Sequence, residues 1–162
     1  MKIEDFSGNI LEVNRAEEEE VLSPQTAYLI TDLLEGVIKN GTGYNAKALG
    51  RPAAGKTGTT NDFSDAWFIG YTPDLVAGVW VGYDDRSPLG ERESGGVIAC
   101  PVWTRFMQEA TKDKPELDFP VPDNIVFVRI DTKTGHHTVA CDDDDIGYTR
   151  SHVAALSPHN DR

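Results

Sequence analysis

Hydrophobic residues recur at helical spacing between positions 24 and 40. They follow one another at three- and four-residue steps, which places them on one helix face: Ile30, Leu33, Leu34, Val37 and Ile38. Ser23 suits the N-cap and Pro24 the first helical position. Asn40-Gly41 is a stop signal, because glycine accepts the left-handed conformation past a helix end. We therefore predict a helix over 24–40 and a glycine-rich loop over 41–52.

Three strand-like segments separated by short turns follow this loop. They are Ala53–Thr60, Asp65–Tyr71 and Leu75–Tyr83, with turns at 61–64 and 72–74. Connections this short force neighbouring strands to run antiparallel. Leu75–Tyr83 is almost continuously apolar, which predicts a strand buried on both faces.

The patterns at the two ends are shorter. Residues 1–14 predict a hairpin around Ser7-Gly8-Asn9. A second helix is predicted over 98–112, with one apolar face made of Val102, Trp103, Phe106, Met107 and Ala110. A proline-containing linker at 112–122 precedes a strand at 125–130, a turn at 131–135 and a short return strand at 138–140. From Cys141 onward we expect poor order. The predicted class is α+β, an antiparallel sheet flanked by helices.

Composition narrows the range of partners. The chain has 162 residues, 15 basic and 27 acidic, and a formal charge of −12, while 39% of its residues are hydrophobic. This length favours one domain. Strong acidity excludes an ordinary nucleic-acid binder, which needs a basic face to displace counterions. No window approaches the roughly 18 apolar residues of a membrane span.

Several other residues have a structural and a functional interpretation. Cys100 and Cys141 are compatible with two free thiols or with one bridge, and Cys100 is expected to be a small buried residue. His136, His137 and Asp142–Asp145 are better explained as a solvated charged segment than as a metal site, so we predict no metal and no cofactor. For the aromatic residues Trp67, Phe68, Trp80 and Tyr83, core packing is favoured over a pocket lining.

The tripeptide Lys56-Thr57-Gly58 carries the chemistry. It lies inside a predicted strand flanked by small residues, where the backbone is open to an extended peptide. Gly58 removes a side chain that would block this approach. The hydroxyls of Thr57 and Thr59 and the charge of Lys56 suit a peptide that ends in a carboxylate. Residues 44–72 carry three basic and two acidic residues in an otherwise acidic chain. From spacing alone, a threonine-rich edge strand with a solvated lysine explains the segment equally well.

A second copy, Lys133-Thr134-Gly135, lies in a predicted turn after Asp131. Aspartate and glycine are typical turn residues, so we assign this copy a turn role only.

The wider sequence resembles the transpeptidase domain of class A, bifunctional penicillin-binding proteins. The resemblance rests on five segments: Leu22–Tyr28, Arg51–Asp62 around the Lys-Thr-Gly motif, Asp65–Pro73, Val79–Asp85 and Phe119–Asp123. It covers about residues 1–130, and nothing beyond His136 contributes. It implies that 1–113 is the C-terminal portion of a transpeptidase domain, a partial penicillin-binding fold. Residues 114–162 are then a linker, a short hairpin and an acidic tail.

The resemblance also implies roles for individual residues. The parent enzymes cross-link peptidoglycan stem peptides through a serine acyl-enzyme that β-lactams trap. Lys56 would tune the proton network, while Thr57, Gly58 and Thr59 would bind the carboxylate. The backbone N–H of Thr59 would be one oxyanion donor. A glycosyltransferase domain, a membrane anchor and an extracytoplasmic location are expected of the parent protein.

The nucleophile motif of this family, Ser-x-x-Lys, does not occur in the sequence. None of the seven serines is followed by lysine three positions later: Ser7, Ser23, Ser64, Ser87, Ser94, Ser151 and Ser157. Ser7-Gly8-Asn9 spells the family's Ser-x-Asn, but it lies in a predicted turn only 49 residues before Lys56. We therefore expect an inactive transpeptidase fragment that begins after the nucleophile.

Two alternatives remain at this point. A non-catalytic module could bind peptides or partner proteins through the same strand edge, and a serine β-lactamase fragment matches less well. Missing helical cover would expose apolar sheet surface, so we also expect a homodimer or a larger assembly.

Overall fold

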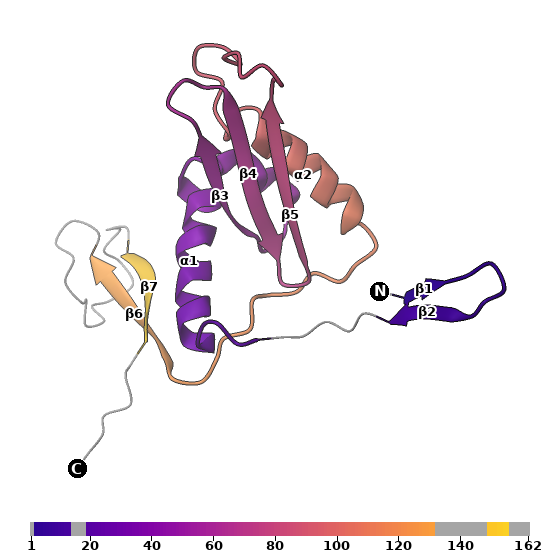
Figure 1. Cartoon of the computed structure of the whole chain (residues 1–162). Helices are drawn as coiled ribbons and strands as arrows, with labels where there is room; N and C mark the ends of the chain where they lie inside the picture. The colour runs from indigo at the N-terminus through magenta and orange to yellow at the C-terminus, as the bar shows by residue number, and fades with distance from the viewer. Residues whose placement is uncertain (1, 14–18, 132–148, 156–162) are drawn as a thin grey trace.

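The computed structural model of the chain describes residues 2–13, 19–131 and 149–155. Its elements in chain order are β1 (Lys2–Glu4), β2 (Ile10–Val13), α1 (Pro24–Asn40), the 3₁₀ helix η1 (Tyr44–Leu49), β3 (Ala54–Thr59), β4 (Asp65–Thr72), β5 (Leu75–Gly82), α2 (Ala99–Ala110), β6 (Ile125–Asp131) and β7 (Thr149–Ala155). Figure 1 shows β3, β4 and β5 side by side, with α1 and α2 packed against them. The predicted α+β class is confirmed.

Helix α1 begins as its sequence predicts and ends for a different reason. The Ser23 side chain accepts a hydrogen bond from the Thr26 amide at 3.2 Å, and Pro24 is the first helical residue. Gly41 is not left-handed, because its φ is −115°. A Cβ at Gly41 would instead lie 2.9 Å from the Cα and the carbonyl oxygen of Val37. Glycine is therefore required by close backbone approach rather than by a positive φ.

The segment predicted as a loop at 41–52 contains a 3₁₀ helix, η1. Its Ala46 and Leu49 are buried, and Gly50 ends it with a φ of 75°. The prediction missed η1 because short helices of this type show little periodicity and are held by tertiary packing. This helix contacts both α1 and α2.

The central sheet has the order β3-β4-β5 and is antiparallel throughout. Its register sets Lys56 opposite Ile69, Thr57 opposite Phe68 and Gly58 opposite Trp67. Because side chains alternate between the faces of a strand, Lys56 and Thr57 point to opposite faces. Within the described residues β3 is an edge strand of this sheet.

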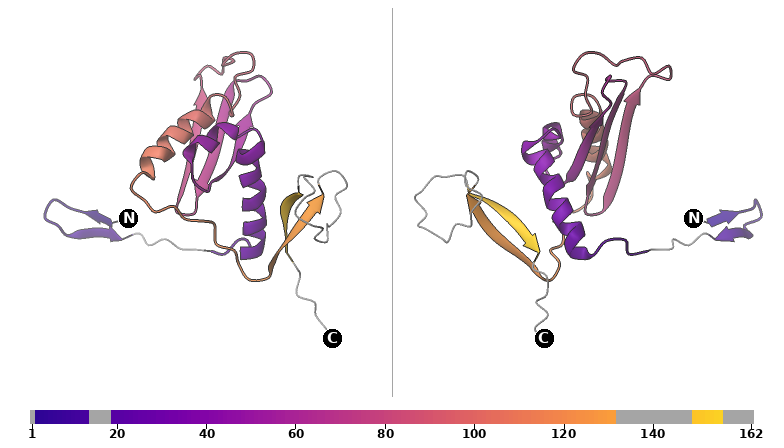
Figure 2. Two further views of the ribbon diagram at one scale, coloured as in Figure 1. Left: turned by 180° about the vertical axis from the view of Figure 1, so that it is seen from behind. Right: turned by 60° about the vertical axis from the view of Figure 1, so that its left-hand side comes forward.

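The core lies between one sheet face and the two helices, as the two views of Figure 2 show. Phe68 and Trp103 are fully buried and meet edge to face, with ring centroids 5.0 Å apart. Buried edge-to-face aromatic pairs stabilise a fold more than their buried surface area alone would predict. The other core residues are Ile38, Ala46, Leu49, Ala53, Ala99, Cys100 and Met107.

The opposite face of the sheet is largely exposed in the described part of the chain. Its exposed apolar residues are Trp67, Ile69, Val76 and Trp80. The prediction that Leu75–Tyr83 is buried on both faces is therefore wrong. The residues of β5 alternate between half-buried and exposed, since α2 covers one face only. The apolar run reflects β-branched and aromatic residues on an uncovered surface.

Helix α2 buries a narrower stripe than its pattern predicts. Trp103 and Met107 are fully buried, whereas Val102 and Phe106 are half exposed. The Trp103 indole donates a hydrogen bond to the carbonyl of Ala77 on β5 at 3.0 Å. The helix therefore contacts the sheet along the 103–107 line, and the rest of its apolar face is turned outward.

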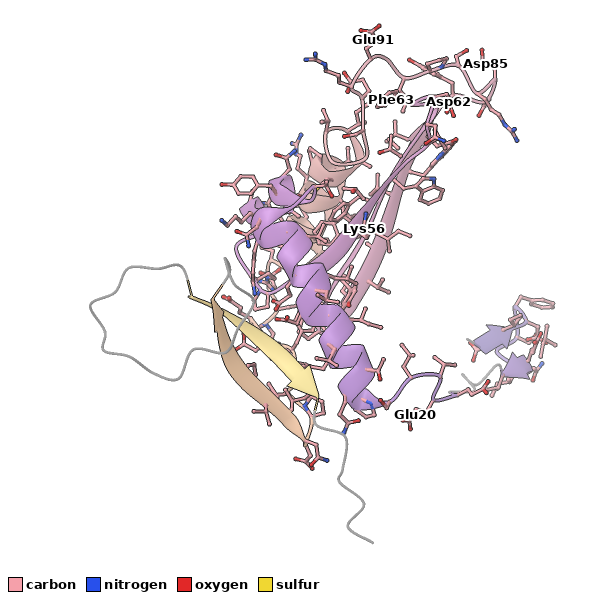
Figure 3. All side chains as sticks on the ribbon, turned by 90° about the vertical axis from the view of Figure 1, so that its left-hand side faces the viewer. Glu20, Lys56, Asp62, Phe63, Asp85 and Glu91 are labelled. Atoms are coloured by element: carbon pink, nitrogen blue, oxygen red, sulfur yellow. The ribbon has the colours of Figure 1, made fainter. Side chains whose placement is uncertain are left out.

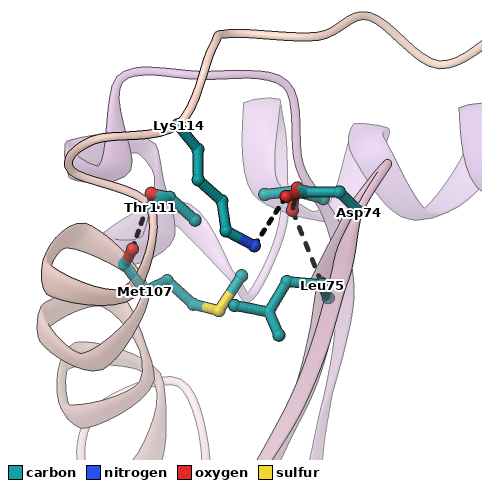
Figure 4. Close-up of polar contacts among 6 residues, drawn as sticks. Asp74, Leu75, Met107, Thr111 and Lys114 are labelled. Atoms are coloured by element: carbon teal, nitrogen blue, oxygen red, sulfur yellow. Dashed lines mark hydrogen bonds and ion pairs between the residues drawn. The ribbon is translucent and has the colours of Figure 1, made fainter.

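The segment after α2 returns along the base of the sheet. The Lys114 ammonium pairs with the Asp74 carboxylate at 2.8 Å, and the Thr111 hydroxyl donates to the carbonyl of Met107 at 2.7 Å (Figure 4). This places the residues after α2 beside the β4–β5 turn. The hydrogen bond from Lys114, followed by that from Thr72, lowers the pKa of Asp74.

The chain ends form two separate hairpins. β1 pairs with β2 around a turn in which Gly8 has a φ of 82°, as predicted. β6 pairs with β7 in register from Ile125↔Ala155 to Asp131↔Thr149. Strand β7 lies within the tail that starts at Cys141, for which we expect poor order. The predicted turn at 131–135 falls largely outside the described residues, and the predicted return strand at 138–140 falls entirely outside them. No helix among the described residues is long and apolar enough to cross a membrane.

Candidate functional site

The Lys-Thr-Gly motif occupies the middle of β3. Lys56 is exposed on the open face of the sheet, as Figure 3 shows, and Thr59 is also exposed. Thr57 and Gly58 are half-buried. An edge strand with these exposures offers main-chain and side-chain groups to an extended ligand. The segment is thus neither helical nor sealed within the interior.

Two hydroxyls on β3 are held by residues distant in sequence. The Thr57 hydroxyl lies 2.8 Å from that of Thr42, just after α1. The Thr59 hydroxyl accepts a hydrogen bond from the Gly95 amide at 3.0 Å. Both hydroxyls therefore have a hydrogen-bond partner before any ligand arrives, and that of Thr59 accepts from its partner.

Lys56 supplies the positive charge of this strand. Its ammonium donates to the carbonyl of Thr57 at 2.9 Å. No ion pair joins Lys56 to an acidic residue in the described part of the chain. A lysine without an anionic partner at a strand edge attracts a negatively charged ligand.

A hollow of about 570 Å³ begins where the motif ends. It is lined by Thr60, Asp62, Ser64, Asp65, Trp80, Tyr83, Asp84 and Arg86. Lys56, Thr57 and Thr59 do not line it, so the motif and the hollow are neighbours along β3 rather than one site. Trp80 and Tyr83 line it and are exposed, as is Trp67, so core packing is confirmed only for Phe68.

The β3–β4 turn, which lines part of this hollow, is stabilised by side-chain hydrogen bonds. The Thr60 hydroxyl accepts from the Asp65 amide at 2.9 Å. The Asp65 carboxylate accepts from the Trp80 indole at 2.8 Å and from the Ser64 hydroxyl at 3.1 Å. Hydrogen bonds from Thr60 and then Ser64 lower the pKa of Asp62. Asp65 therefore connects the turn to β5, a role that the sequence did not assign.

The remaining candidates lie elsewhere or take structural roles. Ser7, Gly8 and Asn9 lie in the β1–β2 turn, where the Asp5 carboxylate accepts from the amides of Ser7 and Asn9. Cys100 is a buried free thiol, and burial raises its pKa. The second Lys-Thr-Gly copy, Cys141, the histidines at 136 and 137 and the 142–145 acidic run lie outside the described residues. Within the described ranges no group of three or more potential ligands could hold a metal.

Sequence reasoning missed the residues that support the motif from a distance. Thr42 and Gly95 lie 14 or more positions from Lys56 and share no motif with it. The only local signal was the Gly95-Gly96 pair, because paired glycines mark close backbone approach as well as turns.

The chain resembles characterised proteins across most of its length. A family profile described as "Penicillin binding protein transpeptidase domain" matches residues 2–108. Penicillin-binding protein 1A of Pseudomonas aeruginosa is 52% identical over 118 residues, which are 72% of this chain and 14% of that protein. The Aquifex aeolicus protein of the same name is 41% identical over 158 residues, 98% of this chain and 21% of that protein.

A solved structure agrees with the sequence matches. The crystal structure of penicillin-binding protein 1A from Haemophilus influenzae superimposes with a TM-score of 0.70 at 34% identity, over 83% of this chain and 21% of that one. The chain thus spans about a seventh to a fifth of the length of these relatives. Because the family profile covers about two thirds of the sequence, the chain belongs to the penicillin-binding protein transpeptidase family.

Proposed function

We propose that this chain supplies the carboxylate-binding strand of a serine-type DD-transpeptidase that cross-links peptidoglycan. The observation that carries the proposal is Lys56-Thr57-Gly58-Thr59 on an accessible edge strand, in a chain of this family. An extended peptide adds to such an edge through main-chain hydrogen bonds, and side chains provide specificity.

Each residue of the motif has a role in this proposal. The hydroxyls of Thr57 and Thr59 donate hydrogen bonds to the carboxylate of a stem peptide or a β-lactam. Lys56 attracts the same charge and takes part in the proton network. The backbone N–H of Thr59 donates to the oxyanion that forms during acyl transfer. Loss of one such donor typically costs about 3 kcal/mol in the transition state.

The nucleophile of the proposed reaction lies outside this polypeptide. No serine of the chain begins a Ser-x-x-Lys motif, and without an activated serine no acyl-enzyme forms. The parent enzyme then carries the nucleophile, a glycosyltransferase domain and an N-terminal membrane anchor, and it works on the extracytoplasmic face of the membrane.

Labelling with a fluorescent penicillin tests the catalytic half of this proposal. We expect no gel-stable covalent adduct on the isolated chain, because no activated serine is present. A stoichiometric adduct would contradict the proposal, since it would require a nucleophile within residues 1–162.

Reversible binding tests the strand itself. Lys56→Met should weaken binding of a carboxylate-ended peptide about fivefold, as expected for one charge contact near a surface. Lys47→Met is the matched control, because Lys47 lies over the ring of Tyr44 and not on β3. Equal affinities for both variants and the unmodified chain would contradict a role for Lys56.

A non-catalytic binding module is the second candidate. The same exposed β3 edge together with the absence of Ser-x-x-Lys favours it. The coding sequence upstream of residue 1 separates the two candidates. An in-frame Ser-x-x-Lys supports the transpeptidase, and a reading frame without one supports the binding module.

A further inference from the structure

We propose that the Gly95 amide orients the Thr59 hydroxyl so that it donates to a ligand carboxylate, which makes Gly95 a positioning residue for ligand choice. This inference rests on the proposed function, because it assumes that β3 binds a carboxylate. Gly95 lies 36 positions after Thr59, between β5 and α2.

The hydrogen-bond arrangement around Thr59 carries the argument. A threonine hydroxyl has one proton to donate and two lone pairs to accept with. The Gly95 amide donates to Thr59 Oγ1 at 3.0 Å and so occupies one lone pair. The hydroxyl proton must then point away from Gly95. Among the described residues it has no acceptor, and Thr59 is exposed, so the proton is available to an incoming anion.

The Gly95 peptide is itself fixed on both sides. Its carbonyl accepts from the Cys100 amide at 2.8 Å, in the first turn of α2. The next carbonyl, that of Gly96, accepts from the Asn45 side chain at 2.8 Å. The segment that holds Thr59 is therefore anchored to both α2 and η1.

Only glycine fits at position 95. A Cβ there would overlap the Trp67 carbonyl oxygen and lie 2.5 Å from that of Gly58. Both are backbone atoms of paired strands, which cannot turn aside as a flexible side chain does. The Gly95 backbone thus closely approaches the β3–β4 pair at the level of the motif.

This geometry predicts selectivity for charge at the ligand terminus. A carboxylate accepts a strong, charge-assisted hydrogen bond from an oriented hydroxyl, whereas a neutral carboxamide accepts a weaker one. The hydrogen bond that the Gly95 amide donates also polarises the Thr59 hydroxyl, which makes this hydroxyl a stronger donor to the ligand. Loss of the Gly95 contact should therefore reduce the preference for the carboxylate more than it reduces binding overall.

The test compares N-acetyl-D-alanyl-D-alanine with its C-terminal carboxamide, by NMR titration of the whole chain. We expect the unmodified chain to prefer the carboxylate, and Gly95→Ala and Thr59→Val each to reduce the preference about tenfold. The double variant should lose no more preference than Thr59→Val alone, because the Gly95 contact acts only through the Thr59 hydroxyl. Thr59→Ser should keep the preference, since it keeps the hydroxyl.

Gly78→Ala is the matched control. A Cβ at Gly78 meets only Ile69 Cγ1, at 3.5 Å, so this variant should keep both fold and preference. If Gly95→Ala keeps the preference, or lowers the affinity for both ligands equally, the inference is wrong while the proposed function stands. If the unmodified chain shows no preference for the carboxylate, the proposed function fails as well.

A second measurement needs no variant at position 95. In the unmodified chain, the carboxylate ligand should shift the amide resonance of Gly95, and the carboxamide should shift it less. In Thr59→Val the response to the carboxylate should disappear. A Gly95 resonance that responds identically to both ligands would overturn the inference, even if Gly95→Ala does not fold.

Discussion

Individual glycines set how closely the layers of this chain approach one another. At Gly70 on β4, a Cβ would lie 2.7 Å from Trp103 Cζ2 and 2.9 Å from Phe68 Cε1. Both rings belong to the fully buried core. Because Gly70 has no side chain, Trp103 of α2 can pack directly against the backbone of β4.

Gly70→Ala should destabilise the fold. Both rings are confined, so an added methyl group forces them from their positions, at a typical cost of about 1–3 kcal/mol. Thermal and urea denaturation measure the change in free energy of unfolding. Gly78→Ala is the control, because its Cβ makes an ordinary contact. If the two variants are equally stable, the packing of α2 on Gly70 is looser than these distances indicate.

At the scale of elements, the sequence patterns correctly predicted those helices and strands that depend on interactions between residues close in sequence. Helix α1, the three central strands and the β1–β2 hairpin follow from capping, turn and periodicity signals, and so does the placement of Lys56 on a strand. Helix η1, the one-sided burial of β5 and the pairing of β7 with β6 depend on contacts between distant segments. The support of Thr57 by Thr42 and of Thr59 by Gly95 was not predictable for the same reason.

The buried line of α2 gives a direct test of this distinction. Met107→Ala should cost about 2–5 kcal/mol of unfolding free energy, because a fully buried side chain leaves a cavity. Phe106→Ala should change stability by less than about 0.5 kcal/mol, since Phe106 is half exposed. Chemical denaturation of both variants measures this. If both variants lose the same unfolding free energy, the helix buries the wider apolar face that the periodicity predicts.

The contact between Asp74 and Lys114 should make stability depend on pH. The folded state lowers the pKa of Asp74 from 3.8, so the unfolded state binds the proton more tightly. The stabilisation is therefore complete at neutral pH and is lost as the pH falls through 3.8 and then through the folded pKa.

Lys114→Met should lower the melting temperature at pH 6. This difference should shrink as the pH falls through 3.8 and then through the lower folded pKa of Asp74, because Asp74 is then protonated in both states. Lys112→Met is a suitable control, because Lys112 is exposed and has no ion pair among the described residues. If the melting temperature of Lys114→Met stays equally far below that of the unmodified chain at low pH, the ion pair is not the cause of the difference.

At the scale of the whole molecule, the described residues cover one face of the central sheet and leave the other face open. The exposed residues Trp67, Ile69, Val76 and Trp80 lie on the open face. Apolar side chains gathered on an uncovered sheet favour association. The net charge of −12 opposes this association through repulsion that salt screens.

We therefore expect self-association that increases with ionic strength. Light scattering at several protein and salt concentrations measures the mass. The double variant Ile69→Lys/Val76→Lys should shift the chain toward the monomer. Leu33→Lys on α1 is the control, because Leu33 is exposed on a helix and not on the open sheet face. A monomer at high concentration and high salt would contradict the expectation.

The distribution of the three tryptophans gives the chain a built-in optical reporter. Trp103 is fully enclosed, whereas Trp67 and Trp80 are 44% and 45% exposed, with ring centroids 6.3 Å apart. Trp67 is the register partner of Gly58 in the motif. A soluble quencher therefore reaches two of the indoles and spares the third. Fluorescence quenching thus reads the environment of the motif strand separately from the integrity of the interior, without any attached dye.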